Sequence, residues 1–308
     1  MKKLIALLLV LTMAASVACA ELFTAPTEEE PAEETTTEAA APAATLPIDF
    51  SAGHAAPDSN YTEESYTDES ITVTVEHVWV DDARYNVAHV KIADASQLRT
   101  ALAADFGKTK TNKISTIAKN NNAIVAIGGD YYSDRNNGYV VRQGQVYRTK
   151  LAKTLDILFV DQNGDFHIIL SSNADELKAL LDSGATPINV FNFGPALVVD
   201  GEQKDVSTYS NFNPKGNEPR CAIGQVGPLE YVMVVVDGRN AAQSNGCTLN
   251  ELASFMKSLD CTQAFNLDGG NSSLMVFHGE NYSQKSKSAE RSVSDIIYFA
   301  TAIDYGMD

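Results

Sequence analysis

Short segments in which apolar and polar residues alternate, separated by turn residues, limit the fold of this 308-residue chain more than any other feature. Ile71, Val73 and Val75 alternate with polar residues, a period of two that predicts a strand with one buried face. About ten strands are expected. Those with recognisable bounds are 71–75, 85–93, 123–127, 188–199, 220–226, 229–236, 263–267, 273–277 and 295–302, and turns at Gln143-Gly144 and Gln162-Asn163-Gly164 predict hairpins.

Helical patterns are fewer. Thr248 to Glu251 has the form of a capping box, and apolar residues follow it at helical spacing. The predicted helices are Ser96–Phe106, Lys113–Asn120, Ala174–Leu181 and Leu249–Leu259. Because short turns join most strands, neighbours should pair antiparallel. The expected class is α+β, a single domain with a mixed, largely antiparallel sheet and about four helices.

The first twenty residues have the pattern of a secretory signal peptide. Lys2 and Lys3 precede the apolar stretch Leu4–Met13, which is too short for a membrane anchor, and Ala18-Cys19-Ala20 is a small-x-small cleavage site. Cleavage after Ala20 is favoured over lipidation of Cys19, the alternative. The mature protein is therefore expected to be secreted or held at the cell surface, without a membrane span. If Cys19 is lipidated instead, a lipid anchor at Cys19 would hold it there.

Residues 21–66 are rich in Glu, Thr, Pro and Ala and have few large apolar side chains, which predicts a disordered linker. Residues 1–70 carry 13 acidic side chains and only two basic ones, whereas the remaining residues carry 27 acidic and 21 basic ones. No basic run exceeds two residues. The folded domain is expected at 67–308, and nucleic acid is excluded as a partner because no basic surface is indicated.

Three cysteines remain after removal of Cys19. The helix expected between Cys247 and Cys261 would place them roughly 16 Å apart, well beyond the Cα separation of about 4.4–6.8 Å that a disulfide requires. Cys221 could pair with either one. The favoured interpretation is that none of the three forms a structural disulfide.

Three predicted strands end in a glycine-containing polar corner. These corners are Gly128-Gly129-Asp130, Asp237-Gly238-Arg239 and the segment 268–273. A single Asp-Gly pair is usually an ordinary turn. Three such corners in one chain, together with the several hydrogen-bonding side chains close to Asp268, favour a binding or catalytic site. Arg220, at the start of a strand, is either paired to a carboxylate or a planar fork for phosphate or carboxylate.

Several segments resemble the phosphodiester glycosidase family in order and spacing. They are 126–132, 193–201, Pro219–Gly224, Val235–Arg239 with 246–259, Ala264–Ser273 and Glu290–Asp295. Gly128, Asp130, Tyr131, Cys221 and Asn271 depart from the family pattern. The resemblance implies a secreted hydrolase that cleaves the glycosidic bond of a sugar 1-phosphodiester in cell-envelope or extracellular glycans. The sugar is expected to be similar to N-acetylglucosamine.

The resemblance also suggests roles for individual residues. Such a reaction needs carboxylates beside the anomeric carbon and arginines on the phosphate. The expected catalytic residues are Asp268, Asp237, Arg220 and Arg239. The expected substrate-binding residues are Gly129, Asp130, Asn192, Asn266, Gly269, Gly270, Asn271, Ser272, Ser273 and Arg291.

Two alternatives remain open. One is a non-catalytic glycan-binding module of the same fold, associated with a cell surface or exopolysaccharide. The other is a hydrolase in which Asp130, Asp237 and Asp268 hold a divalent cation such as calcium. The five histidines are scattered without metal-ligand spacing, so no cofactor is expected.

Overall fold

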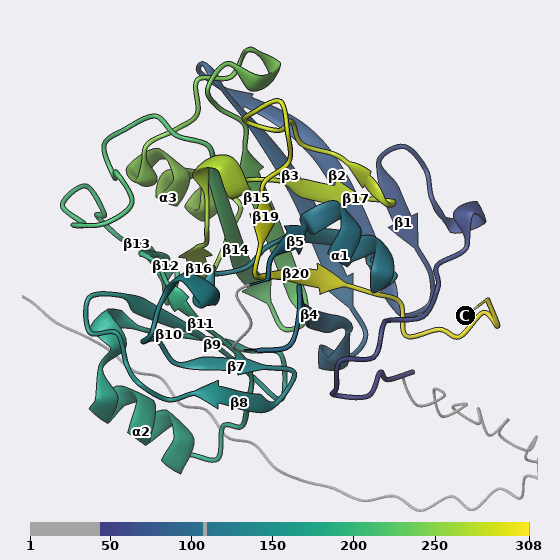
Figure 1. Cartoon of the computed structure of the whole chain (residues 1–308), viewed down its shortest axis with the longest axis horizontal. Helices are drawn as coiled ribbons and strands as arrows, with labels where there is room; N and C mark the ends of the chain where they lie inside the picture. Colours follow the sequence, from purple (N-terminus) through teal and green to yellow (C-terminus); the bar gives the residue numbers. More distant parts are fainter. Residues whose placement is uncertain (1–43, 107–109, 308) are drawn as a thin grey trace, which may run out of the picture. The chain divides into compact units, whose positions relative to one another are not determined.

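Antiparallel sheets dominate the computed structural model, which describes residues 44–106 and 110–307 (Figure 1). The described residues form three large sheets and one two-stranded sheet, and every strand pair in them is antiparallel. Residues 41–308 group into one unit. The fold is thus β-rich and α+β, as the strand patterns predict.

The largest sheet has eight strands and carries the edge at which the candidate site lies. In β2, Ile71, Val73 and Val75 are buried and the residues between them are exposed, which confirms the expected alternation. In spatial order the strands are β1 (Ser65–Thr67), β2 (Ile71–Val80), β3 (Ala83–Ile92), β15 (Glu230–Val236), β14 (Arg220–Gly227), β16 (Gln263–Asn266), β12 (Ala196–Val199) and β13 (Glu202–Gln203).

Two five-stranded sheets and a short pair complete the strands. One sheet has the order β10 (Phe166–Ile169), β9 (Asp156–Asp161), β11 (Pro187–Phe193), β7 (Val140–Arg142) and β8 (Gln145–Arg148). The other has the order β18 (Glu280–Asn281), β17 (Met275–Phe277), β6 (Val125–Gly128), β20 (Asp295–Phe299) and β4 (Leu98–Leu102). The pair is β19 (Ser292–Val293) with β5 (Asn112–Lys113).

Three α-helices are present in the described residues: α1 (Ile114–Asn120), α2 (Ala174–Asp182) and α3 (Leu249–Ser258). Three of the four predicted helices are thereby confirmed. At the start of α3, the Thr248 hydroxyl accepts from the Glu251 N–H and the Glu251 carboxylate accepts from the Thr248 N–H, the expected capping box.

The predicted helix Ser96–Phe106 is wrong. A 3-10 turn at Ala95–Gln97, capped by Asp94, leads into β4, which pairs with β20. Four of the five β4 residues are buried, so the segment contacts apolar neighbours on both sides and tertiary packing overrides its local pattern.

A shared apolar core lies where the sheets meet, and each helix covers a further cluster. The central core draws on β2, β3, β6, β9, β14, β15, β17 and β20. Helix α3 packs on the other face of the large sheet, α1 packs on β6 and β20, and α2 packs on β7 and β9 (Figure 1). The core therefore fixes the strands that carry the site residues.

Residues 44–66, which precede the predicted domain boundary at residue 67, include side chains packed into the domain. Leu46 is 4% exposed and Tyr66 is fully buried, so both belong to the packed domain. The buried Arg99 donates to the carbonyls of Pro47, Asp49 and Ser51, which ties this segment to β4. The compositional argument for a linker does not hold from residue 44 to residue 66, because a few apolar anchors and one buried arginine suffice to dock it. The predicted signal peptide, Cys19 and the linker up to residue 43 lie outside the described residues.

Two further findings concern the membrane and the cysteines. Within residues 44–106 and 110–307, no helix is long and apolar enough to cross a membrane. Cys221, Cys247 and Cys261 are free and buried. Burial raises the pKa of each of the three thiols, so they behave as small apolar side chains.

Candidate active site

Three of the predicted site segments meet at one edge of the large sheet. β15 and β16 both pair antiparallel with β14, so their C-terminal ends lie beside its N-terminal end. Asp237 follows β15, Asp268 follows β16, and Arg220 is the first residue of β14. The sheet topology thus brings together residues that are far apart in the sequence.

A pocket of about 260 Å³ opens at this edge. The predicted site residues that line it are Arg220, Arg239, Asn266, Asp268, Gly269 and Gly270. The other lining residues are Phe193, Phe212, Asn213, Glu218 and Leu267. The pocket therefore combines carboxylates, guanidinium groups and aromatic rings in one small space.

The Asp268 carboxylate is the central acidic group of this pocket. Its Oδ2 atom is buried and has no hydrogen-bond partner. Burial raises the pKa of Asp268 above its ordinary value, while the Ser272 hydroxyl and the positive charges of Arg291 and Arg135 act in the opposite direction. A buried carboxylate with an unused oxygen in a pocket wall is free to contact a bound molecule.

Other unused polar atoms gather in the same corner. Asn266 Oδ1 and Ser273 Oγ are buried and have no hydrogen-bond partner, and the Ser272 hydroxyl has Asp268 as its only polar neighbour in this corner. The Asn266 amide donates to the Gly194 carbonyl at 2.8 Å, which fixes its orientation and leaves its oxygen unused. Since buried polar groups are normally paired, this concentration indicates groups that a ligand or water satisfies.

Gly269 and Gly270 allow the corner to lie close to the start of β14. A Cβ on Gly269 would come within 2.9 Å of the Pro219 carbonyl oxygen, and Gly270 has a φ of +61°. The Gly270 N–H donates to that same oxygen at 2.8 Å. A larger residue at either position would displace the corner and with it Asp268.

Arg239 and Glu218 form an ion pair in the pocket wall. Arg239 Nη2 lies 2.7 Å from Glu218 Oε2, and Arg239 Nη1 donates to Asn271 Oδ1. Arg239 is 39% exposed, so a negatively charged ligand can reach it. Glu218 is a second carboxylate of the pocket, and the sequence analysis did not select it.

Two further arginines place positive charge near Asp268. The Arg291 guanidinium lies 4.9 Å from the centre of the Tyr131 ring, and its side chain is exposed. Arg135 lies 4.8 Å from the centre of the Phe193 ring and donates to the Asn192 carbonyl at 2.6 Å. The structure thus keeps Arg291 beside the candidate site and adds Arg135, which the sequence did not indicate.

Arg220 does not have the free guanidinium that a phosphate grip requires. Its nitrogens donate to the carbonyls of Cys247, Phe212, Asn213 and Gly216 at 2.8–3.0 Å. Burial lowers the pKa of Arg220 from its ordinary value. Although it lines the pocket, Arg220 holds the 212–216 loop in place, and neither of the two roles expected from the sequence describes it.

Asp237 lies outside the pocket, although its strand ends at the same edge. Its Oδ2 atom is 2.7 Å from Arg84 Nε, and its Oδ1 atom accepts from the Gln284 N–H at 2.9 Å. The Asp237 side chain is fully buried. Both oxygens of Asp237 are thus engaged within the fold, which leaves neither available for the catalytic role expected from the sequence.

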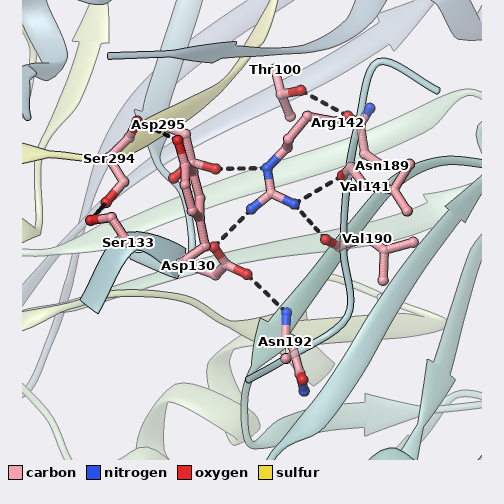
Figure 2. Close-up of polar contacts among 12 residues, drawn as sticks. Thr100, Asp130, Ser133, Val141, Arg142, Asn189, Val190, Asn192, Ser294 and Asp295 are labelled. Atoms are coloured by element: carbon pink, nitrogen blue, oxygen red, sulfur yellow. Dashed lines mark hydrogen bonds and ion pairs between the residues drawn. The ribbon is translucent and has the colours of Figure 1, made fainter. Parts of the chain in front are cut away.

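Asp130, Arg142 and Asp295 form a buried ionic cluster (Figure 2). Arg142 donates to Asp130 and to Asp295, each at 2.7 Å, and all three side chains are at most 1% exposed. The second oxygen of Asp130 accepts from the Asn192 N–H, and the Gly129 carbonyl accepts from the Asp268 N–H at 3.1 Å.

The cluster changes the expected roles of three residues. Gly129, Asp130 and Asn192 do not line the pocket. The Asn192 side-chain NH2 donates to the Asp156 carbonyl and to the Ser172 hydroxyl, and its Oδ1 atom accepts from the Tyr139 N–H. The Asp130 and Asn192 side chains are thus engaged within the fold and lie outside the lining of the pocket.

Aromatic rings form one wall of the pocket. Phe193 and Phe212 stack with ring centres 4.1 Å apart, and Tyr209 stacks beyond Phe212 at 6.3 Å. Flat apolar faces of this kind complement the carbon–hydrogen faces of a ring-shaped ligand. The sequence analysis included Phe193 in a family segment but assigned it no role.

A shared cation site for Asp130, Asp237 and Asp268 is not formed. Asp130 is bound to Arg142 and Asp237 to Arg84, so these two carboxylates are engaged at separate places. In the part of the chain that the structure describes, no group of three or more His, Cys, Asp or Glu residues is arranged to hold a metal ion.

Sequence reasoning missed residues for two different reasons. Glu218 lies directly before the family-like run Pro219–Gly224, and no sequence feature gave a reason to select it. Asp295 closes the family-like segment Glu290–Asp295, but no local signal indicates Arg142 or its pairing with Asp295. They are 153 positions apart and meet only when β7 and β20 pack together.

Solved structures of similar fold are known. The catalytic domain of zebrafish N-acetylglucosamine-1-phosphodiester alpha-N-acetylglucosaminidase, auto-inhibited by its pro-peptide, matches with a TM-score of 0.59 and 15% identity, over 81% of this chain and 87% of that chain. A hypothetical protein from Synechocystis matches with a TM-score of 0.53 and 18% identity, over 77% and 64%. Identities this low establish the fold alone.

A sequence relative and a family model give the closer assignment. The SPbeta prophage-derived uncharacterized protein YomE of Bacillus subtilis is 31% identical over 202 residues, which is 62% of this chain. The chain spans 30% of the length of that relative. The model of the phosphodiester glycosidase family matches residues 121–300, more than half of the chain, and this protein therefore belongs to the phosphodiester glycosidase family.

Proposed function

We propose that this protein hydrolyses the glycosidic bond of a sugar 1-phosphodiester whose sugar resembles N-acetylglucosamine. The observation that carries the proposal is the Asp268 carboxylate, which has an unused oxygen in a pocket that also contains Arg239. Family membership supports the reaction class. The printed name of the zebrafish relative supports the choice of sugar.

The pocket has groups suited to the sugar. Asp268 Oδ2 and Asn266 Oδ1 are unused acceptors, and the Ser273 hydroxyl has no partner either. Sugar hydroxyls and an amide N–H are neutral donors that satisfy such groups without adding charge. A metal cation fits less well, because the positive charges of Arg291 and Arg135 already act on Asp268. Phe193 and Phe212 supply the flat face for the ring.

The phosphate is assigned to the exposed arginines. Arg239 and Arg291 both reach solvent, and Arg291 has an aromatic contact with Tyr131 that orients its guanidinium. Guanidinium groups bind phosphate oxygens in pairs and neutralise the charge on a departing phosphate monoester. Arg220 is not part of this grip, because its donors are engaged by carbonyls.

The chemistry demands little of a general acid, since a phosphate monoester is a good leaving group. The remaining task is to stabilise positive charge on the anomeric carbon and to direct the attacking water. Asp268, in its ionised form, does both: its negative charge faces the sugar, and its unused oxygen accepts a proton from the water. Glu218 keeps Arg239 in position through their ion pair.

We also propose that the protein acts outside the cytoplasm on glycans of the cell envelope, from the signal-peptide pattern of residues 1–20. Fractionation of cells that express the full chain tests the location. Recovery in the medium or envelope fraction supports it, and retention of the uncleaved chain in the cytoplasm contradicts it.

The reaction is tested by incubating the purified protein with a panel of sugar 1-phosphodiesters and uncharged chromogenic glycosides, with and without a chelator. Release of a free sugar and a phosphate monoester, lost in Asp268→Asn, is the expected result. Asp237→Asn serves as the matched control and should keep turnover. It makes the same change at the other Asp-Gly corner of this sheet edge, which does not line the pocket. Retained glycan binding without turnover of any substrate would instead identify a non-catalytic binding module.

A further inference from the structure

The buried cluster of Asp130, Arg142 and Asp295 has an imbalance of charge. One guanidinium faces two carboxylates, and none of the three side chains is more than 1% exposed (Figure 2). If both carboxylates were ionised, the cluster would carry a net negative charge out of contact with water. Such a charge is strongly unfavourable, so one carboxylate is expected to hold a proton.

The hydrogen bonds show which carboxylate holds it. Both oxygens of Asp130 accept N–H groups, one from Arg142 and one from Asn192, which leaves no oxygen for a proton. Asp295 accepts from Arg142 Nε through Oδ2 alone, and its Oδ1 atom is buried without a partner. Oδ1 of Asp295 is therefore the one carboxylate oxygen of the cluster that is free to be protonated.

The surroundings of Asp295 connect it to the pocket. Its Oδ1 atom would lie only 2.4 Å from a Cβ placed on Gly129, and the Gly129 carbonyl accepts from the Asp268 N–H. A glycine is thus required between the two aspartates. One peptide unit separates the buried cluster from the carboxylate of the pocket.

The charged and titratable groups that face Asp295 come from three directions. Arg142 approaches from β7, Asp130 from the end of β6, and Asp268 from the end of β16. Tyr132 lies nearby; burial raises its pKa, and the negative charge of Asp295 adds to this effect. On the Asp130 side of the cluster, Arg148 interacts with the Asp130 charge and Arg135 donates to the Asp130 carbonyl. On the paired strand β4 the partner of Asp295 is the apolar Leu102. Burial raises the pKa of Asp295, Arg142 lowers it, and Asp130 and Asp268 raise it further.

We propose that Asp295 is a positioning residue that holds one proton on Oδ1 near neutral pH, keeps the buried cluster neutral, and so removes a negative charge from behind Asp268. Asp130 keeps both of its oxygens on the N–H groups of Arg142 and Asn192. When the pH rises, the proton passes from Asp295 to solvent and the cluster becomes negative. This inference deepens the proposed function, and it rests on that function only where it assigns Asp268 to the reaction.

The expected consequence for catalysis is a selective pH dependence. A negative charge behind the pocket disfavours an anionic phosphodiester, so its KM should rise as Asp295 loses its proton. An uncharged glycoside of the same sugar should show a smaller change. In Asp295→Asn, KM for the phosphodiester should stay constant over the same pH range, because the asparagine stays neutral and its oxygen still accepts from Arg142.

The deciding experiment needs no substrate. Protein labelled with ¹³C at the aspartate carboxyl carbons is titrated between about pH 5 and pH 9 by NMR. One resonance should titrate in the neutral range and vanish in Asp295→Asn. In Asp268→Asn and in Asp130→Asn it should titrate lower by roughly one pH unit, because each variant removes a repelling charge. The latter two also test the proposal if Asp295→Asn does not fold.

The matched control is Asp161→Asn. Asp161 is a buried aspartate whose Oδ1 accepts the N–H groups of Asn163 and Asp165 in the β9–β10 hairpin, away from the cluster. This variant should leave the neutral-range resonance unmoved. An Asp295 carboxyl that is ionised throughout the range, or that Asp268→Asn leaves unmoved, overturns the proposal.

The two readouts separate the failure of the inference from the failure of the proposed function. A neutral-range resonance with no turnover of any substrate supports the buried proton and contradicts the proposed reaction. Turnover without such a resonance supports the proposed reaction and contradicts the buried proton on Asp295. A neutral-range resonance with a pH-independent KM overturns the link between Asp295 and substrate binding.

Discussion

Asp237 and Asp268 follow two strands on either side of β14 and end at the same edge of the sheet, yet their surroundings are opposite. Asp237 is fully buried, with one oxygen on Arg84 and the other on the Gln284 N–H. Asp268 lines a pocket and has a buried oxygen without a partner. The first corner is closed by its contacts, and the second remains available to a ligand.

The difference shows how the same turn chemistry serves two purposes. A carboxylate whose hydrogen bonds are all made within the fold stabilises that fold and has no capacity left for another molecule. A carboxylate with an unused oxygen reduces stability slightly and gains a place to bind. Arg220 and Arg291 repeat the contrast, since the first donates to four carbonyls and the second lies exposed over Tyr131.

The largest effect should come from exchanging the two aspartates for asparagine. Asp268→Asn should lower kcat by at least about 10²-fold, because it removes a charge needed in the transition state, and should leave the fold intact. Asp237→Asn should instead lower the free energy of unfolding by about 3 kcal/mol, because Arg84 loses its buried partner. Steady-state kinetics and urea unfolding measure the two effects. Equal losses of kcat in both variants would remove the distinction between the corners.

Arg220→Ala should be the most destabilising of the arginine variants. The guanidinium links the 212–216 loop to β14 through four carbonyls, so its loss should lower the free energy of unfolding by about 3 kcal/mol. Differential scanning calorimetry measures the change, and Arg291→Ala is the control that should leave stability within about 0.5 kcal/mol of wild type. A stable Arg220→Ala variant with poor binding of phosphodiesters would return Arg220 to the phosphate grip.

Phe212→Leu should weaken binding without regard to substrate charge. It keeps apolar volume but removes the ring that stacks on Phe193, so KM should rise roughly tenfold for charged and neutral substrates alike. Phe50→Leu, at an exposed aromatic in another pocket, is the control and should have no effect on KM. A change confined to the charged substrate would show that Phe212 does not contact the sugar.

Arg291→Ala should have a smaller effect, limited to charged substrates. An exposed charge contributes up to about 1 kcal/mol, so KM for a sugar phosphodiester should rise roughly fivefold, and less at high salt. The uncharged glycoside should be processed as by wild type. Identical changes for both substrates would argue that Arg291 supports the pocket structurally.

The last expected effect does not involve substrate and concerns the pH dependence of stability. Because the pKa of Asp295 is raised by burial, the unfolded chain releases this proton at lower pH than the native protein. The native state then binds more protons, so stability falls as the pH rises above about 4 toward the native pKa. Wild type should lose stability over this range relative to Asp295→Asn, by about 1.4 kcal/mol for each unit by which the native pKa exceeds that of the unfolded chain. If the free energy of unfolding changes with pH in the same way in wild type and Asp295→Asn, the pKa of Asp295 is not raised in the native protein.

Much of the fold could be predicted because its signals are local. The alternation in β2 and the capping box before α3 depend on residues next to one another in the sequence. The segment Ser96–Phe106 could not be predicted in this way. Its residues form β4 because β20, almost 200 positions later, supplies the hydrogen-bonded partner and the apolar cover.

The candidate site divides along the same line. The glycine corner at 268–273 was recognisable, because its glycines and polar residues are consecutive. The pairing of Arg142 with Asp295, and of Arg84 with Asp237, has no local pattern, and these pairs decide which carboxylates are engaged. The expected roles of Asp237 and Arg220 changed for this reason.

The sequence by itself determined the antiparallel, β-rich class, three of the helices, the family resemblance and the position of the Asp268 corner. Turn propensity, strand alternation and helix capping act between near neighbours, so the order of residues is enough to specify them. Only the tertiary structure decided which of two equivalent corners stays open and which arginine is free. Hydrogen-bond capacity is used up by partners from distant strands, and only the folded chain brings those partners within reach.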